Sequence, residues 1–543
     1  MRRLLVAVRS AAWIASLVAA AAVGPAAAQA APDTAPKATR PRTAYEDMAM
    51  FSQVLNQIRV NHPDSIDQHE LIVAAVEGMV HAADPHSFVV WFTPMSAAKE
   101  KAWEDGKLYP VPVTFEFIEG TPIVVGIAPG TAAAQLDILR GDALIAADGR
   151  AISSEREQEL EIELAGPKKS MVKLTFERRR VDGTITTIQR DVKRERIDKG
   201  ETAVPVAFML DGKTGYIRIN TFLGEDISDD LHRAIGRLQN HGMQRLILDL
   251  RANGGGRVDE AARVAGEFLP SGALVYTSEG RKSEVTDTGR VKRSFWKSEQ
   301  RFPIVLMVDE GTASASELVA GALQDHDRAL IVGQPTFGKS LLMQGFPLGN
   351  GTELYGYIEL VIGHVRTPCG RVIQRQYHAM TRREYYRMAR TARDTAGRPW
   401  CKTDNGRVVY GGGGIYPDIV FAARPPAPAW DYRILESDLQ IKWVPGYISA
   451  NPALFPSLDS LAAHPRILEA GIAQFRDYVA KEGIIVPSGA ESDSLLNRVL
   501  VKRIAQVKFG DEGFYRLAAL LDADVFLAAG SFESAQRILG PAR

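Results

Sequence analysis

Residues 304–325 read IVLMVDEGTASASELVAGALQD, and this stretch decides the fold. Its first five residues are apolar, as in a buried strand, and residues 317–324 have the apolar spacing of a helix. A short polar turn joins the two, which is the repeating unit of an α/β protein. The same alternation recurs on both sides, with strands predicted at 215–220, 246–250 and 329–332 and helices at 227–238 and 258–268. We therefore predict an α/β core over 196–424 with an at least partly parallel sheet.

The turn inside this stretch, from Gly311 to Glu317, contains the first candidate for chemistry. A serine on a tight turn between strand and helix is exposed, and the helix N-terminus supplies amide donors that favour a developing oxyanion. Ser314 is the candidate nucleophile. The alternative is structural, with Ser314 or Ser316 capping the helix and Glu317 completing a capping box.

Two glycine-containing segments elsewhere in the predicted core favour the catalytic interpretation. Gly338-Lys339 follows a buried strand, and a lysine drawn into a dry pocket can act as a neutral base. An exposed loop lysine is the alternative. Residues 251–256 read RANGGG and follow another apolar strand, and their glycines can bring backbone N–H groups close to a ligand.

The rest of the chain divides into regions with different patterns. Residues 1–30 have the basic start, apolar stretch and small-residue end of a secretory signal peptide, and 31–43 form a proline-containing leader that we expect to be disordered. Residues 44–104 and 425–543 show helical spacing, whereas 105–195 show short strands separated by turns. A retained signal acting as a membrane anchor is the alternative to cleavage, although polar residues interrupt its apolar stretch.

Composition and residue counts exclude some classes of function. Lys+Arg and Asp+Glu both number 65, so the net charge is zero and no basic nucleic-acid platform is indicated. The two cysteines, Cys369 and Cys401, can form a disulfide after export, and two free thiols is the alternative. No cluster of potential metal ligands lies near Ser314 in the sequence, so we predict neither a metal nor a cofactor. His326, beside Asp325, is a rival base for Ser314.

At these residues the chain resembles the C-terminal processing, or tail-specific, peptidases, which are the PDZ-containing Ser-Lys proteases of peptidase family S41. The family reads approximately S/T-A-S-A-S-E followed by T-F/Y-G-K, and residues 312–317 and 336–339 match these motifs. The resemblance implies that Ser314 is the nucleophile and Lys339 its general base. It also assigns a supporting role to Ser316 and Glu317 and an oxyanion hole to the amides of Gly255, Gly256 and Ala315.

The resemblance extends over most of the chain. Residues 83–87 are similar to the family's L-D-P-H-S motif, and 105–195 resemble its PDZ domain. Gln344 corresponds to the glutamine that orients the family's lysine, although it falls one position later. Residues 108–112 replace the glycine-rich PDZ loop that binds a carboxylate, and their prolines lack the N–H donors such a loop needs. Residues 375–410 form an apparent insertion.

The fold and function implied by this resemblance are specific. We expect a multidomain α/β protein with a crotonase-like protease core, acting as an exported, periplasmic serine endopeptidase that cleaves proteins near their C-termini. The PDZ-like module would present substrate or gate the site. Expected partners are polypeptide tails, an adaptor protein and, through the C-terminal helices, a second copy of the chain. The alternatives are a catalytically silent peptide-binding scaffold and an acyl-CoA enzyme of crotonase type, which would not need Lys339.

Overall fold

The computed structural model describes much of the chain between residues 43 and 539. The described residues are 43–91, 102, 107–118, 121–127, 132–136, 138, 141–152, 154, 157–179, 185–195, 203–282, 284–293, 299–349, 354–377, 385, 395–422, 427–437 and 439–539. The predicted signal peptide and all but the last residue of the leader lie outside them. Within these ranges, no helix combines the length and the apolar character needed to cross a membrane. The chain separates into two compact units, Met1–Ala75 and Val76–Arg543.

Two helices occur near the start of the described chain, as predicted. They are α1 (Ala44–Asn61) and α2 (Gln68–Ala83). The prediction that 44–104 is helical is wrong at Phe88–Trp91, which form strand β1. This run reads FVVW, and aromatic and β-branched residues fit a pleated, half-buried surface better than a helix.

The α/β core is built on a six-stranded sheet whose order is β19-β14-β13-β10-β9-β8. All neighbouring pairs are parallel except β8 and β9. The strands are β8 (Val206–Met209), β9 (Thr214–Arg218), β10 (Arg245–Asp249), β13 (Ile304–Val308), β14 (Leu330–Gly333) and β19 (Ile419–Val420), and the helices between them are α5 (Ile227–Asn240), α6 (Val258–Ala265) and α7 (Ala315–Asp325). The predicted alternation of strand and helix is confirmed.

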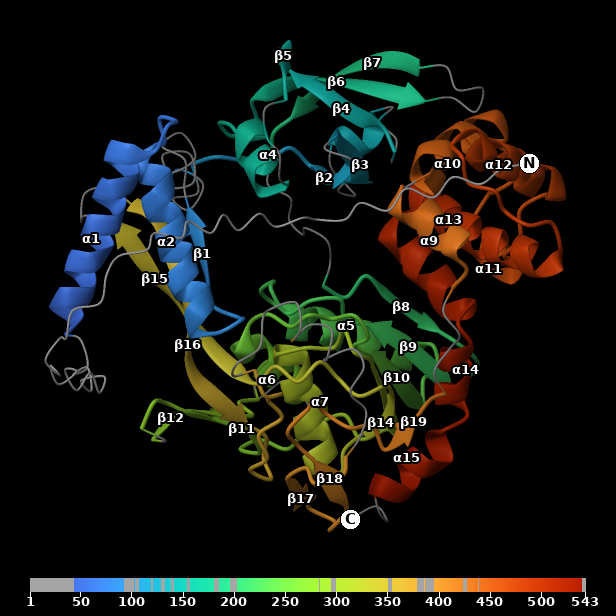
Figure 1. Ribbon diagram of the computed structural model, residues 1–543. Helices are drawn as coiled ribbons and strands as arrows, with labels where there is room; N and C mark the ends of the chain where they lie inside the picture. The colour runs from blue at the N-terminus through green and yellow to red at the C-terminus, as the bar shows by residue number, and fades with distance from the viewer. Residues whose placement is uncertain are drawn as a thin grey trace, which may run out of the picture. The chain divides into compact units, whose positions relative to one another are not determined.

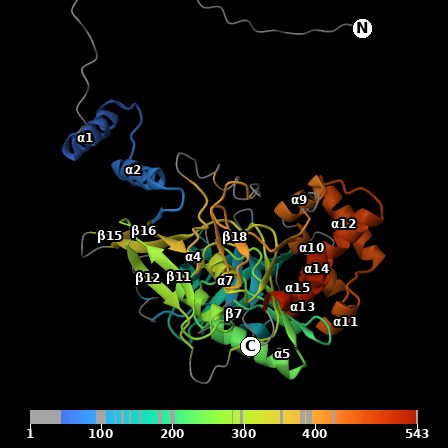
Figure 2. The same ribbon diagram turned by 90° about the horizontal axis from the view of Figure 1, so that it is seen from below.

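Both faces of this sheet are covered. Successive residues of β10 point to opposite faces. Leu246 and Leu248 belong to the core formed with α5, α6 and α7, whereas Ile247 belongs to the core formed with α14 (Ala523–Ala529) and α15 (Phe532–Leu539). Figures 1 and 2 show α14 and α15, in red, alongside this sheet. Burial on both faces explains the continuous apolar runs of these strands.

A second sheet was not predicted, and it is antiparallel throughout. Its order is β1-β16-β11-β12, and β15 also pairs with β16. The new strands are β11 (Leu274–Glu279), β12 (Val285–Arg290), β15 (Leu341–Gly349) and β16 (Leu354–Arg366). Strand β12 reads VTDTGR and is almost entirely exposed, so it has no apolar alternation to reveal it. A small hairpin of β17 (Trp400–Lys402) and β18 (Val408–Tyr410) lies within the apparent insertion.

The region resembling a PDZ domain is a compact antiparallel β module. Its main path is β2-β3-β4-β6-β7, with β5 paired to β4. Its elements are β2 (Val113–Ile118), β3 (Thr121–Ile127), the 3₁₀ helix η1 (Ala132–Gln135), β4 (Ala143–Ala147), β5 (Arg150–Ala151), α4 (Glu157–Leu164), β6 (Met171–Arg179) and β7 (Ile185–Lys193). Strand β7 was not predicted from the sequence.

The C-terminal region is helical, as predicted. Besides α14 and α15 it contains α9 (Ala429–Glu436), α10 (Leu439–Ala450), α11 (Leu458–Ala463), α12 (Glu469–Lys481) and α13 (Ala490–Leu520). Helix α13 is interrupted at Gly510, whose φ of 75° and ψ of −166° are not helical. Its first part packs with α9 to α12 around a core of their own, and its last turn reaches the core of the six-stranded sheet.

Candidate active site

The turn between β13 and α7 holds Ser314 in a strained backbone conformation. Its φ is 56° and its ψ is −120°, which residues with a side chain rarely adopt. Such strain persists only where the surrounding structure enforces it, and it is concentrated at functional sites. The side chain is half-buried at the N-terminus of α7, where unpaired backbone amides gather.

The carboxylate of Glu317 holds both candidate catalytic residues. Its Oε2 accepts hydrogen bonds from the backbone N–H groups of Ser314 at 2.9 Å and Lys339 at 2.8 Å. Its Oε1 accepts from the Thr336 hydroxyl at 2.5 Å and the Gly338 N–H at 2.7 Å. Because Oε2 is shared, the backbone nitrogens of Ser314 and Lys339 lie within about 6 Å of each other. The loop that carries the lysine is therefore fastened to the turn that carries the serine.

Burial changes the acid chemistry of this carboxyl group. The Glu317 side chain is inaccessible to solvent. Desolvation raises its pKa from an ordinary value of 4.5 to about 7, while the hydrogen bonds from Thr336, Lys339, Gly338 and Ser314 act in the opposite direction. Glu317 is thus a group that titrates near neutral pH.

The glycine loop at 251–256 lies directly against the Ser314 turn. Gly255 has a φ of +96°, and a Cβ added there would lie 2.7 Å from the Ala313 carbonyl oxygen and 2.8 Å from the Ser314 Cβ. Only glycine combines this backbone conformation with this close approach. The glycine segment that the sequence singled out therefore lies against the Ser314 turn.

Asn253, which the sequence did not single out, joins these two segments. Its backbone oxygen accepts from the Ala313 N–H and from the Ser316 hydroxyl, both at 3.0 Å. Ser316 is fully buried, and its hydroxyl is occupied by this bond. The geometry therefore favours Ser314 over Ser316 as the nucleophile.

The predicted oxyanion donors differ in their availability. The Gly255 N–H already donates to the Asn253 side-chain oxygen at 3.0 Å. The amides of Gly256 and Ala315 donate to no acceptor within the described ranges. Gly256 and Ala315 are therefore the better placed candidates, and Gly255 supplies the close approach of the backbone.

Two other predicted residues make no hydrogen bond to this cluster among the residues that the structure describes. His326 caps the opposite end of α7, twelve positions from Ser314 and therefore roughly 18 Å away at the rise of an α-helix. Its ring nitrogens lie 2.7 Å from Asp404 Oδ2 and 2.8 Å from the Leu274 oxygen. Gln344 is exposed on β15, and its side chain makes no hydrogen bond to a residue that the structure describes.

Arg375, at the start of the insertion, is a further residue that sequence reasoning missed. Its buried guanidinium donates to the backbone oxygens of Phe337 at 3.2 Å and Gly413 at 2.6 Å, and its N–H donates to the Gly338 oxygen at 2.9 Å. The Tyr385 hydroxyl donates to the same Gly338 oxygen at 3.2 Å. The insertion thereby braces the loop before Lys339. Arg375 lies 36 positions after Lys339 in the sequence, so no local pattern pointed to this contact.

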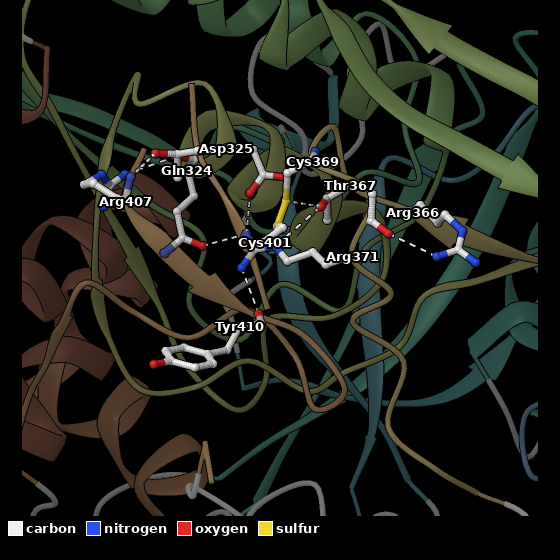
Figure 3. Close-up of a disulfide and its surroundings, with 11 residues drawn as sticks. Gln324, Asp325, Arg366, Thr367, Cys369, Arg371, Cys401, Arg407 and Tyr410 are labelled. Carbon is white, nitrogen blue, oxygen red and sulfur yellow. Dashed lines mark hydrogen bonds and ion pairs between the residues drawn. A yellow bond between two sulfur atoms is a disulfide. The ribbon is translucent and has the colours of Figure 1, made fainter. Parts of the chain in front are cut away.

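Cys369 and Cys401 are joined by a disulfide (Figure 3). It fastens the β17–β18 hairpin to the turn after β16. The Cys369 N–H donates to Asp325 Oδ2 at 3.1 Å, and the same carboxylate pairs with the buried Arg371 at 2.7 Å. Asp325 and the two sulfurs form a group of potential metal ligands, but each sulfur is bonded to the other.

Comparison with known proteins identifies the family. The family model described as peptidase family S41 matches residues 213–380. A carboxy-terminal-processing protease of Bartonella bacilliformis is 32% identical over 338 residues, which are 61% of this chain and 73% of that protein. The chain belongs to peptidase family S41. The matched region of this S41 chain includes the glycine loop, the Ser314 turn and the Lys339 loop.

Other relatives of this S41 chain have related names. Carboxyl-terminal-processing peptidase 2 of Arabidopsis thaliana, a chloroplast protein, is 31% identical over 233 residues, 43% of this chain and 44% of that protein. Among solved structures, the photosystem II D1 C-terminal processing protease covers 69% of this chain and 88% of its own, with 21% identity and a TM-score of 0.35.

Proposed function

We propose that this chain is a serine endopeptidase that cleaves proteins near their C-termini, with Ser314 as nucleophile and Lys339 as general base. The observation that carries the proposal is the shared Glu317 carboxylate, which binds the backbone of both residues. If Lys339 had only a structural role, its loop would not need to be attached to the turn that holds Ser314 in a strained backbone conformation. Because Glu317 is buried and accepts four hydrogen bonds, it fixes the two segments with little freedom.

The reaction is acyl transfer to Ser314 followed by hydrolysis. The neutral amine of Lys339 accepts the proton of the Ser314 hydroxyl as its oxygen attacks the substrate carbonyl carbon. The amides of Ala315 and Gly256 donate to the oxyanion, and the protonated lysine returns its proton to the leaving amine. Water then releases the acyl group by the same steps. Gln344 is exposed and has no part in this scheme.

Export and substrate delivery complete the proposal. The signal-like residues 1–30 direct the chain to the periplasm, and the β module at 105–195 acts as the PDZ-like domain that presents substrate or gates the site. N-terminal sequencing of the mature protein should then begin at Gln29 or Ala31, and an intact Met1 would contradict cleavage. An adaptor and self-association through the C-terminal helices stay predictions of the sequence.

Substitution of the two proposed catalytic residues tests the chemistry. Ser314→Ala and Lys339→Arg should each be folded and should each lose on the order of 10²-fold or more in kcat/KM on an unfolded protein substrate, because arginine keeps the charge but cannot accept a proton. The assay is substrate cleavage followed by mass spectrometry of the products. Ser316→Ala should retain far more activity than Ser314→Ala, which separates the two serines.

Lys213→Arg is the matched control, because Lys213 is exposed in the turn between β8 and β9. It should leave kcat/KM unchanged. Substantial activity in Lys339→Arg would move the proton transfer to another group. Undetectable cleavage by the wild-type chain, with intact binding of peptides, would instead favour the catalytically silent scaffold.

A further inference from the structure

The C-terminal helices line an open pocket that the proposed reaction does not use. It has a volume of about 360 Å³ and lies between α9, α10, α13 and the residues that begin α14. Pockets that bind small ligands start at about this size. Its lining combines cations, buried hydrogen-bond acceptors and apolar side chains. These three features respectively indicate the charge, the hydrogen-bond donor and the apolar part that a ligand needs.

Two cations on one face of α13 line the pocket without a direct partner. Arg498 and Lys502 are one helical turn apart. Within the described part of the chain, neither side chain forms a hydrogen bond or an ion pair. Burial lowers the pKa of Lys502 and the charge of Arg498 lowers it further, whereas the carboxylates of Asp431 and Asp522 raise it. An anion placed between these two side chains would relieve their repulsion.

Two buried oxygen acceptors line the same pocket. Asp431 is 8% exposed and Gln440 is 2% exposed. Asp431 Oδ1 and Gln440 Oε1 have no hydrogen-bond partner in the ranges that the structure describes. Buried acceptors need donors, so a ligand of this pocket has to offer an N–H or O–H group in addition to its negative charge. An inorganic anion without a proton, such as sulfate, does not meet both requirements beside the carboxylate of Asp431.

The remaining wall is apolar, with Leu435, Leu495, Val499 and Leu521 among its residues. A ligand with a negative charge, an adjacent N–H donor and an apolar side chain is what the last residue of a polypeptide presents. The α-carboxylate, the backbone N–H and the side chain of that residue are all attached to one Cα atom, so the three groups fit one small cavity.

The β module offers poor donors for such a carboxylate. In the loop at 108–112, Pro110 and Pro112 have no N–H group. The Tyr109 N–H already donates to the Gly166 oxygen at 2.8 Å. A substrate tail that is selected for its free carboxylate therefore needs a different recognition site.

We propose that the pocket between α9, α10 and α13 binds the free C-terminal residue of a polypeptide, with Arg498 and Lys502 on its carboxylate and Asp431 or Gln440 on its amide N–H. The choice of a polypeptide rests on the proposed function. The site then recognises the tail of a substrate or product at a place separate from Ser314.

Binding without turnover tests this site. Full-length Ser314→Ala protein is titrated into a fluorescent peptide of about ten residues that ends in leucine, with either a free carboxylate or a C-terminal amide. Fluorescence anisotropy should show at least about tenfold tighter binding of the free acid, because the amide loses a charge-assisted contact. Lys502→Met and Arg498→Met should each reduce free-acid binding by about tenfold and leave amide binding unchanged.

Lys508→Met is the matched control, since Lys508 is on α13 but does not line the pocket. It should bind the free acid as the parent does. Equal binding of acid and amide overturns the proposal without need of any variant, and so does undiminished acid binding in both pocket variants. Binding of inorganic phosphate at the pocket without acid preference would show a simple anion site and also overturn it. Wild-type cleavage, assayed separately, reports on the proposed function alone.

Discussion

Glu317 shows how one buried residue can organise a candidate active site. A carboxylate accepts several hydrogen bonds, and here it uses two oxygens to hold two separate segments of backbone. The same burial that makes these bonds strong penalises its negative charge. Its pKa of about 7 is the result of these opposing effects. The residue that the sequence offered as half of a capping box is therefore the link between serine and lysine.

The raised pKa of Glu317 predicts a dependence of stability on pH. Because the folded state favours the neutral carboxyl, its contribution is fully present below about pH 4.5 and is lost as the pH rises through about 7. Between pH 5 and pH 8, the free energy of unfolding of the wild type should fall relative to Glu317→Gln by on the order of 3 kcal/mol. Urea unfolding at several pH values measures this difference.

The exposed Glu225 supplies the control for that experiment. Glu225→Gln should follow the wild-type pH profile. Parallel profiles for the wild type and Glu317→Gln would mean that Glu317 stays ionised throughout, held so by its four donors.

At the scale of elements, the insertion is attached at both of its ends. Arg375 and Tyr385 bind the backbone before Lys339, and the Cys369–Cys401 disulfide fastens the later hairpin to the turn after β16. Asp325, the last residue of α7, accepts a hydrogen bond from the Cys369 N–H, and the first turn of the same helix follows Ser314. An added segment has thus become part of the framework around the site.

Removal of the disulfide should lower stability measurably. The two cysteines are 32 positions apart, and closing a loop of this size stabilises a fold by about 4 kcal/mol, chiefly through the unfolded chain. The double variant Cys369→Ser, Cys401→Ser should lose about this amount in the free energy of unfolding. A reductant should destabilise the wild type similarly and leave the variant unchanged. A variant as stable as the oxidised wild type would contradict a structural role for the bridge.

At the scale of the whole molecule, the C-terminal helices complete the α/β core. Ile247, Val305 and Val332 of the six-stranded sheet pack against α14 and α15. Arg251, which begins the glycine loop, pairs with Asp522 at the start of α14 at 2.7 Å. The last part of the chain therefore covers one face of the sheet and contacts the site region.

This coverage predicts different effects for two phenylalanines on neighbouring helices. Phe532 is 5% exposed in the sheet core and lies 4.6 Å from the Arg245 guanidinium, whereas Phe526 is 52% exposed. Phe532→Ala should lower the free energy of unfolding by about 3–5 kcal/mol, and Phe526→Ala should change it by less than about 0.5 kcal/mol. Denaturant unfolding of the full chain measures both. A similar decrease in the free energy of unfolding in both variants would mean that α15 does not pack against the core of the sheet.

The sequence by itself determined the parts of this protein that depend on neighbouring residues. The strands at β10, β13 and β14, the helix after Ser314 and the helices α1 and α2 follow from apolar periodicity. The motifs that contain Ser314 and Lys339 could also be recognised in the sequence, because each motif occupies a few consecutive positions.

Only the tertiary structure decided which segments that are distant in the sequence contact one another. Strand β1 pairs with β16, so Phe88 lies opposite Glu359, and no local pattern encodes that register. The sequence did not reveal that the Gly255 N–H donates to the Asn253 side chain. It also did not reveal that Glu317 binds the backbone of both Ser314 and Lys339. The hydrogen bond from Arg375 to the backbone before Lys339 was equally hidden. Such contacts exist only after the chain has closed long loops, and their partners are selected by packing and burial rather than by adjacent residues.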